Sequence, residues 1–240
     1  MIGNLGFGGG VSRLILFLGL CAWPGAGALA SAERVDQLTQ TALELDAKPL
    51  HGKEVFQASC ARCHGTHAEG DASRAIPTLA GQRFRYIVRQ LANFVGQERE
   101  SPTMERVVSH KGIREPQTWI DVAAYLNGLP TPRKSVTGSG EHAALGRGIF
   151  EMQCATCHKA DAHGDEEGFV PSLRNQNYPY LQLQLEQLAA GSRHNVEEDL
   201  VRFWQSLDDR DVEGVADYLS RLSGPGRVHK FMRRDGTVIN

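Results

Sequence analysis

Apolar residues recur at helical spacing in three stretches of this chain. In the first stretch they are Phe84, Ile87, Val88, Leu91 and Val95, related by steps of three, four and seven residues. This spacing places apolar side chains along one face of a helix. The other two stretches contain Trp119, Val122, Ala123 and Leu126, and Val212, Val215, Leu219 and Leu222. No stretch alternates apolar and polar residues as a series of strands would, so the predicted fold class is all-α.

The chain also contains an internal repeat. A shift of 94 residues carries Cys60 onto Cys154 and His64 onto His158 without a gap. The same register pairs Gly70 with Gly164, Pro77 with Pro171, Leu79 with Leu173, Tyr86 with Tyr180, Gln90 with Gln184 and Arg99 with Arg193. Repeats of this length are domains, because the units of solenoid proteins are far shorter. We therefore predict two tandem helical domains, each with a short helix before its cysteines and a closing helix at its end.

Proline, glycine, serine and threonine gather between the two repeats. This stretch, residues 130–141, is typical of a linker, and its prolines favour an extended chain. We expect an N-terminal domain over residues 31–129, a C-terminal domain over 142–223 and a tail over 224–240.

The first thirty residues have the pattern of a secretory signal. Arg13 precedes an apolar run from Leu14 to Trp23, and small residues follow up to Ala32. An apolar run of this length is too short to cross a bilayer, which needs about 20 residues. We expect residues 1–30 to be a signal peptide, cleaved after Ala30 or Ala32, and the exported protein to be soluble.

Charge and composition narrow the function classes. The 240-residue chain carries 26 lysines and arginines against 28 aspartates and glutamates, a formal net charge of −2. The sequence has no basic stripe or run of like charge of the kind that binds nucleic acid. Aromatic residues make up only 7%, so small domains of this composition need another apolar body to fill their interior.

Loss of the signal would leave four cysteines, all within two C-x-x-C-H motifs that run from Cys60 to His64 and from Cys154 to His158. This is the attachment pattern of c-type haem. Two thiols one helical turn apart form thioethers with the vinyl groups of one porphyrin, and the histidine supplies the proximal nitrogen to iron. We therefore predict two covalently bound haem c groups. The attachment residues are Cys60, Cys63, Cys154 and Cys157, and the proximal iron ligands are His64 and His158.

Three other uses of the cysteines explain less of the pattern. A single zinc site built from all four thiols would need both halves to share one ion, and it gives the histidines no role. Two short-range disulfides suit an exported protein but also leave the histidines unexplained. Thioredoxin-like redox chemistry needs a β-α-β context that the sequence does not predict.

Around these motifs, both halves resemble class I cytochrome c domains, and their tandem arrangement resembles the dihaem cytochrome c4 family. The matching segments of the first half are C-A-R-C-H-G, P-T-L-A-G-Q from Pro77, Y-I-V-R-Q-L from Tyr86, and A-A-Y-L. Those of the second half are C-A-T-C-H, P-S-L from Pro171, Y-L-Q-L-Q-L from Tyr180, G-S-R-H-N and A-D-Y-L. The resemblance covers the chain up to Ser223, the predicted signal excepted. It implies haems in neighbouring domains and electron transfer between respiratory components of a bacterial periplasm.

The resemblance also implies a methionine some 40 residues after each motif as the sixth iron ligand. Met104 stands 40 residues after His64, in a proline-containing loop before the closing helix. We expect Met104 to ligate the first haem; the alternative is that it fills a gap in the core.

The second half departs from this pattern. The register places Glu197 or Glu198 at the methionine position, and the spacing to the closing tyrosine places Leu200 there. None of these side chains is a good ligand for this iron. The nearest nitrogen donor is His194, 36 residues after His158 and in the corresponding loop.

Three assignments of this sixth position remain open: ligation by His194, ligation by the tail residues His229 or Met232, and an iron without a protein ligand. Ligation by His194 is favoured. Because methionine raises the potential of a haem relative to histidine, that assignment predicts electron flow from the C-terminal to the N-terminal haem.

These features predict a periplasmic dihaem electron carrier, and we assign no catalytic residue. Single electrons would come from a dehydrogenase or a quinol-oxidising complex and pass to an acceptor such as a terminal oxidase. The expected partners are thus redox proteins, including membrane-bound ones, and not nucleic acid. Two rival hypotheses are a cytochrome subunit of a periplasmic dehydrogenase and a dihaem enzyme that uses an open second iron.

Overall fold

The computed structural model describes residues 1, 3, 25–132, 135–193, 195–224, 231–232 and 238–239. Its N-terminal helices are α1 (Gly25–Leu43), α2 (Pro49–Val55), α3 (Ala61–His64), α4 (Phe84–Gly96), α5 (Pro102–Val108) and α6 (Pro116–Asn127). Its C-terminal helices are α7 (Ala143–Ile149), α8 (Ala155–His158), α9 (Tyr178–Ala189), α10 (Glu198–Gln205) and α11 (Asp209–Arg221). Three short turns, η1 (Phe56–Cys60), η2 (Ala72–Arg74) and η3 (Phe150–Cys154), complete the helical elements of the described residues. In the tail, β1 (Phe231–Met232) pairs antiparallel with β2 (Val238–Ile239).

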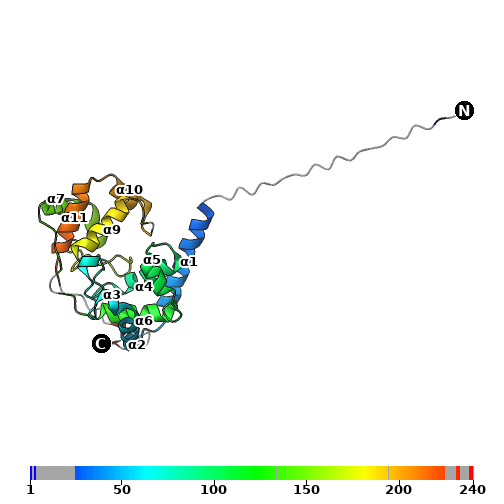
Figure 1. Cartoon of the computed structure of the whole chain (residues 1–240), viewed down its shortest axis with the longest axis horizontal. Coiled ribbons are helices and arrows are strands. Elements are labelled where there is room, and N and C mark those ends of the chain that lie inside the picture. The colour runs from blue at the N-terminus through cyan, green and yellow to red at the C-terminus, as the bar shows by residue number, and fades with distance from the viewer. Residues whose placement is uncertain are drawn as a thin grey trace.

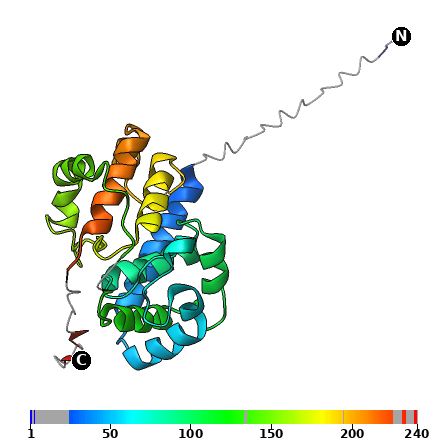
Figure 2. The same cartoon turned by 60° about the vertical axis from the view of Figure 1, so that its left-hand side comes forward.

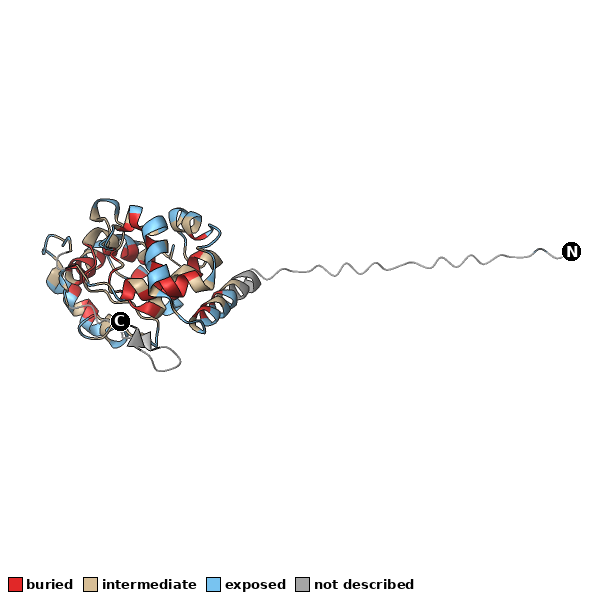
Figure 3. Ribbon diagram, turned by 90° about the horizontal axis from the view of Figure 1, so that it is seen from below, coloured by how far each residue is buried: buried red, intermediate tan, exposed pale blue. Residues whose placement is uncertain are grey.

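The helices form two groups that lie side by side. Figure 1 shows α1 to α6 on one side of the molecule and α7, α9, α10 and α11 on the other, and Figure 2 shows the same division from a second direction. Each group has its own hydrophobic core, with Phe56 and Trp119 fully buried in the first and Phe150 in the second. Buried residues gather toward the interior, and exposed residues lie on the outer faces of the helices (Figure 3). The all-α class predicted from the sequence is confirmed.

The same helix packing occurs in both halves of the chain. In each half the helix before the cysteines lies against the closing helix, α2 on α6 and α7 on α11. Glycine allows the backbones to touch: a Cβ on Gly52 would lie 1.9 Å from the carbonyl oxygen of Asp121, and one on Gly146 would lie 1.9 Å from that of Gly214. These contacts hold the helix before each motif against the closing helix of the same domain.

An aromatic pair also repeats in the two halves. The rings of Phe56 and Tyr125 are 5.6 Å apart between centroids, and those of Phe150 and Tyr218 are also 5.6 Å apart. The two pairs occupy equivalent places in the sequence repeat, so the duplication extends to side-chain packing.

The long helix α1 was not predicted. It buries Val35, Thr39 and Ala42 and packs against α4 and α6. The predicted cleavage points, Ala30 and Ala32, lie within it, whereas residues 4–24 lie outside the described residues. Within the described residues, no helix combines the length and the apolar composition needed to cross a membrane.

The second part of the predicted linker is held by the C-terminal group. Val136 accepts a hydrogen bond from the Tyr178 amide at 2.8 Å, and the Gly140 amide donates to Asp217 Oδ2 at 2.5 Å. Residues 133–134 lie outside the described residues. The stretch after them runs without helix along α9 and α11.

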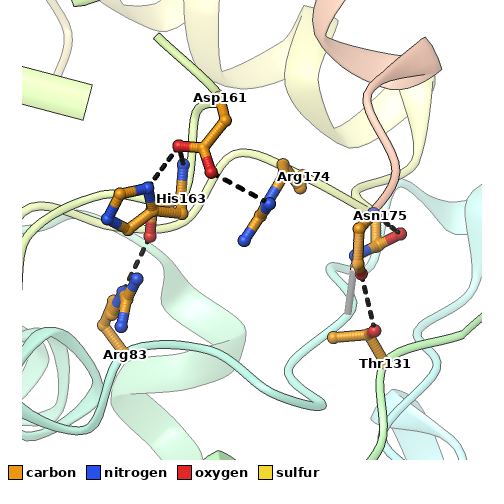
Figure 4. A network of polar contacts seen from close by, with 7 residues as sticks. Arg83, Thr131, Asp161, His163, Arg174 and Asn175 are labelled. Carbon is orange, nitrogen blue, oxygen red and sulfur yellow. Dashed lines mark hydrogen bonds and ion pairs between the residues drawn. The ribbon is translucent and has the colours of Figure 1, made fainter. Parts of the chain in front are cut away.

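Direct contacts join the two groups. Arg83 donates from Nε to the carbonyl oxygen of His163 at 2.7 Å. The His163 ring contacts Asp161, whose second oxygen pairs with Arg174 Nη1 at 3.3 Å (Figure 4). Arg85 reaches across in the same way, with Nη1 2.6 Å from Glu167 Oε2. The two domains are thus docked by polar contacts as well as by the chain between them.

Candidate functional site

A π-helical turn precedes each C-x-x-C-H motif. The amide of Ala61 donates to the carbonyl of Phe56, and the amide of Ala155 donates to that of Phe150. Such wide turns occur often at functional sites. One α-helical turn then follows in α3 and α8, so the two cysteines and the histidine of each motif lie on consecutive turns.

The first thiol of each motif is neutral. Burial, and then the neighbouring Cys63, raise the pKa of Cys60 to about 11. Burial and Cys157 raise the pKa of Cys154 to about 11 in the same way. Burying a thiolate is costly, whereas a thioether brings no charge into the site. The surroundings therefore suit covalent attachment better than thiolate coordination.

The histidines of the motifs are held as neutral donors. His64 is buried, and its Nδ1 lies 3.2 Å from the carbonyl oxygen of Pro77. A carbonyl only accepts hydrogen bonds, so Nδ1 carries the proton and Nε2 keeps its lone pair. His158 repeats this arrangement, 3.1 Å from the carbonyl of Pro171.

Burial is the main reason that the pKa values of both histidines lie below the usual value, and the carbonyl contacts act in the opposite direction. A neutral imidazole whose second nitrogen is bonded to a carbonyl is the common form of a metal-ligating histidine. The sequence register pairs Pro77 with Pro171 without giving either a function. Their carbonyls orient the two imidazoles, and a proline 13 residues after each histidine is the signal that could have revealed this.

The loop after each histidine is closed by the same backbone hydrogen bonds. The Gly70 amide donates to His64 O at 2.8 Å, and the Gly164 amide donates to His158 O at 2.9 Å. Further along, Leu79 donates to Ala68 O and Leu173 to Ala162 O, at 2.8 and 2.9 Å. The two sites therefore share one pattern of backbone hydrogen bonds.

The donor set fits haem c in each half: two thiols, and a neutral histidine with Nε2 free to bind iron. None of the four cysteines in the described part of the chain forms a disulfide. Nor do the described residues include three or more His, Cys, Asp or Glu side chains gathered to hold one metal ion. The four thiols thus do not come together as a single zinc site.

Met104 lies in helix α5, which corrects the expected loop. Ser101 caps this helix: its Oγ accepts from the Met104 amide at 3.4 Å, and the Glu105 carboxylate accepts from the Ser101 amide at 2.7 Å. With Pro102 in the first turn, these residues form the start of a helix, because proline and a serine cap suit a helix N-terminus as well as a loop. Met104 is half-buried, and its ligation of iron stays a prediction.

The corresponding region of the second half is α10. Glu197 is its N-cap and Glu198 its first residue, and Glu198 pairs with Arg202 at 3.2 Å. Leu200 is partly exposed. That none of the three binds iron stays a prediction. His194 and His229 lie outside the described residues, as does the side chain of Met232.

A polar cluster occupies the interface between α4 and α9. Arg99 Nη2 donates to Tyr180 Oη at 3.0 Å and to Gln184 Oε1 at 2.6 Å, and Arg193 Nη1 donates to the same Gln184 oxygen at 3.1 Å. Burial alone would raise the pKa of Tyr86, but the Arg193 and Arg99 guanidiniums lower it. Paired residues of the repeat thus bring two cations together between the domains.

The Cytochrome c family matches this chain twice, over residues 50–130 and 143–223. A protein named thiosulfate dehydrogenase electron acceptor, from Stutzerimonas stutzeri, is 30% identical over 83% of this chain and 94% of its own length. Cytochrome c4 from Azotobacter vinelandii is 26% identical, over 74% of this chain and 89% of its own length.

The solved structures include the same fold. Reduced recombinant cytochrome c4 from Pseudomonas stutzeri matches with a TM-score of 0.64 and 23% identity, over 74% of this chain and all of that one. Two tandem domains of one family, each with a complete C-x-x-C-H motif, imply two covalently bound haem c groups. The chain therefore belongs to the cytochrome c family, as a dihaem protein of the cytochrome c4 type.

Proposed function

We propose that this protein is a periplasmic carrier that moves single electrons between a respiratory donor and an acceptor such as a terminal oxidase. The observation that carries the proposal is the pair of matching proximal sites in domains that pack directly against each other. The proposed attachment residues are Cys60, Cys63, Cys154 and Cys157, with His64 and His158 on the irons. The haems supply the redox chemistry, and the protein supplies ligation, burial and docking surfaces.

The donor that we propose is a dehydrogenase that oxidises a sulfur oxyanion such as thiosulfate. Support comes from the 30% identity to the thiosulfate dehydrogenase electron acceptor of Stutzerimonas stutzeri, which extends over nearly the full length of that protein. The secretory pattern of residues 1–30 supports export to the periplasm. We propose that the carrier encounters the dehydrogenase in that compartment.

We also propose unequal sixth ligands: Met104 on the first iron and His194 on the second. The support is the position of each residue in the repeat, and the absence of methionine from residues 190–205. A thioether favours ferrous iron more than an imidazole does. Electrons would then enter through the C-terminal haem and leave through the N-terminal one.

The test mixes oxidised holoprotein with thiosulfate and a catalytic amount of a thiosulfate dehydrogenase, and follows the haem absorption. We expect both haems to become reduced, and no reduction when either thiosulfate or the dehydrogenase is omitted. Oxidation of thiosulfate by the protein alone would overturn the carrier proposal in favour of a dihaem enzyme. The carrier proposal would also be contradicted if neither dehydrogenases nor quinol-oxidising complexes reduced the protein.

A further inference from the structure

Two buried glutamines join the domains in a reciprocal way. Gln82 donates from Nε2 to the carbonyl oxygen of Ser172 at 2.9 Å, and its Oε1 accepts from the Ser172 amide at 2.8 Å. Gln176 donates to the carbonyl of Thr78 at 3.0 Å and accepts from the Thr78 amide at 2.9 Å. Each side chain therefore binds both backbone groups of one residue in the other domain. Gln82 and Gln176 occupy the same position of the repeat.

The backbone fixes the direction of both side chains. The residue before each glutamine is in the left-handed region, Gly81 with φ +70° and Asn175 with φ +56°. Glycine adopts this conformation freely, and asparagine is among the residues that tolerate it best. Each Oε1 also accepts a hydrogen bond from the backbone amide of the following residue. These donors are Arg83, at 2.8 Å from Gln82, and Asn177, at 3.0 Å from Gln176. The amide oxygen thus lies between two N–H donors, which determines its orientation.

The contacted residues lie next to the partners of the proximal histidines. The peptide between Pro77 and Thr78 presents its carbonyl to His64 Nδ1 and its N–H to Gln176 Oε1. The peptide between Pro171 and Ser172 presents its carbonyl to His158 Nδ1 and its N–H to Gln82 Oε1. Because a peptide is planar, a hydrogen bond on its N–H also fixes the direction of its carbonyl. Such a bond polarises the carbonyl and makes it a better acceptor.

We propose that Gln82 is a positioning residue for the C-terminal haem and Gln176 for the N-terminal haem. Each amide acts across the interface on the peptide that orients the proximal histidine of the other domain. A stronger hydrogen bond at Nδ1 makes the imidazole a better donor and stabilises ferric iron, which lowers the potential. The potential of each haem therefore depends on the neighbouring domain. This proposal rests on ligation of iron by His64 and His158, and not on the identity of the donor or acceptor.

The test replaces each glutamine by methionine, which has similar length and cannot form these hydrogen bonds. Full-length holoprotein is titrated electrochemically while the haem methyl resonances of the two domains are followed separately by NMR. Gln82→Met should raise the potential of the C-terminal haem, with a threefold change in its ratio of reduced to oxidised iron, or about 28 mV for a one-electron couple. Gln176→Met should shift the N-terminal haem in the same direction. In each variant the haem of the mutated domain should move less.

Two further variants separate positioning from loss of the interface. Glu167→Gln removes the interdomain ion pair with Arg85 but leaves both proline peptides intact, and it should leave both potentials within the error of the wild type. Gln82→Glu keeps an acceptor for the Ser172 amide, so the C-terminal potential should return to the wild-type value or fall below it. This variant also tests the proposal if Gln82→Met does not fold.

Three results would overturn the proposal. The potential of the haem in the mutated domain could shift more than that of the other haem, both potentials could shift equally, or neither could shift. A wild-type protein without two haems would instead defeat the proposed function, so the two failures are distinguishable.

Discussion

At the scale of single residues, the haem sites depend on which nitrogen of each histidine is free. The contacts from Nδ1 to the carbonyls of Pro77 and Pro171 leave the Nε2 lone pair free to bind iron in both domains. Both proximal sites are thus equivalent, and a difference between the haems has to come from their sixth ligands or from the surroundings.

Replacement of Met104 tests the first of these ligands. In Met104→Leu the iron of the N-terminal domain loses its thioether, so its potential should fall by tenths of a volt, within the range of about 0.8 V that axial ligands span. The thioether-to-iron absorption band should disappear, and carbon monoxide should bind readily. Met152→Leu is the matched control because Met152 is 72% exposed, and its spectrum should stay that of the wild type. A wild-type protein without the band would show that Met104 is not the ligand.

Replacement of His194 tests the second ligand. His194→Ala should convert the C-terminal haem alone from low-spin to high-spin, because the iron loses its imidazole. Electron paramagnetic resonance of the oxidised protein measures both haems at once, and His110→Ala, an exposed histidine of the other domain, serves as the control. An unchanged spectrum would move the assignment to His229 or Met232, which truncation after Ser223 removes together.

At the scale of elements, the glycines of α2 and α7 set how closely the helices approach. Gly146→Ala should lower the free energy of unfolding of the C-terminal domain by about 1–3 kcal/mol, because the added Cβ collides with the backbone of α11. Gly148→Ala in the same helix should be neutral or stabilise by up to about 1 kcal/mol, since a Cβ there meets nothing within 4 Å. Thermal unfolding of the two holoproteins compares them, and equal effects would contradict the close packing of α7 on α11.

The sequence predicted three helices that carry an apolar face. Helices α4, α6 and α11 bury Ile87, Trp119 and Val215, as the helical spacing indicated. Helices α5 and α10 have only seven and eight residues, too few for a periodic pattern to separate them from loops. The π-helical turns escaped prediction because one wider turn leaves the spacing of the apolar residues nearly unchanged.

The residues of the candidate site also differ in how far the sequence predicts them. The cysteines and proximal histidines are predicted from a local motif, which needs no knowledge of how the domains dock. Gln82 and Gln176 function through the other domain, and their partners depend on how the domains dock. The signal that could have revealed them is that the two glutamines occupy equivalent positions of the repeat.

At the scale of the whole molecule, the duplication places two similar sites in contact, and unequal sixth ligands would give the pair a direction. A redox titration should resolve two separated midpoint potentials, with the lower one in the C-terminal domain. The Met104→Leu variant assigns the haems, because only the potential of the N-terminal haem should fall. Two overlapping potentials, or a lower potential in the wild-type N-terminal domain, would contradict this direction.

The central claim is that each chain binds two haems covalently, one in each domain. A pyridine haemochrome assay on purified, denatured protein measures it most directly, because thioether-bound haem stays with the chain when other haem is extracted. We expect two haems c per chain, and one per chain when both Cys154 and Cys157 are replaced by alanine. One haem or none in the wild-type protein, or zinc in place of iron by metal analysis, would contradict the account.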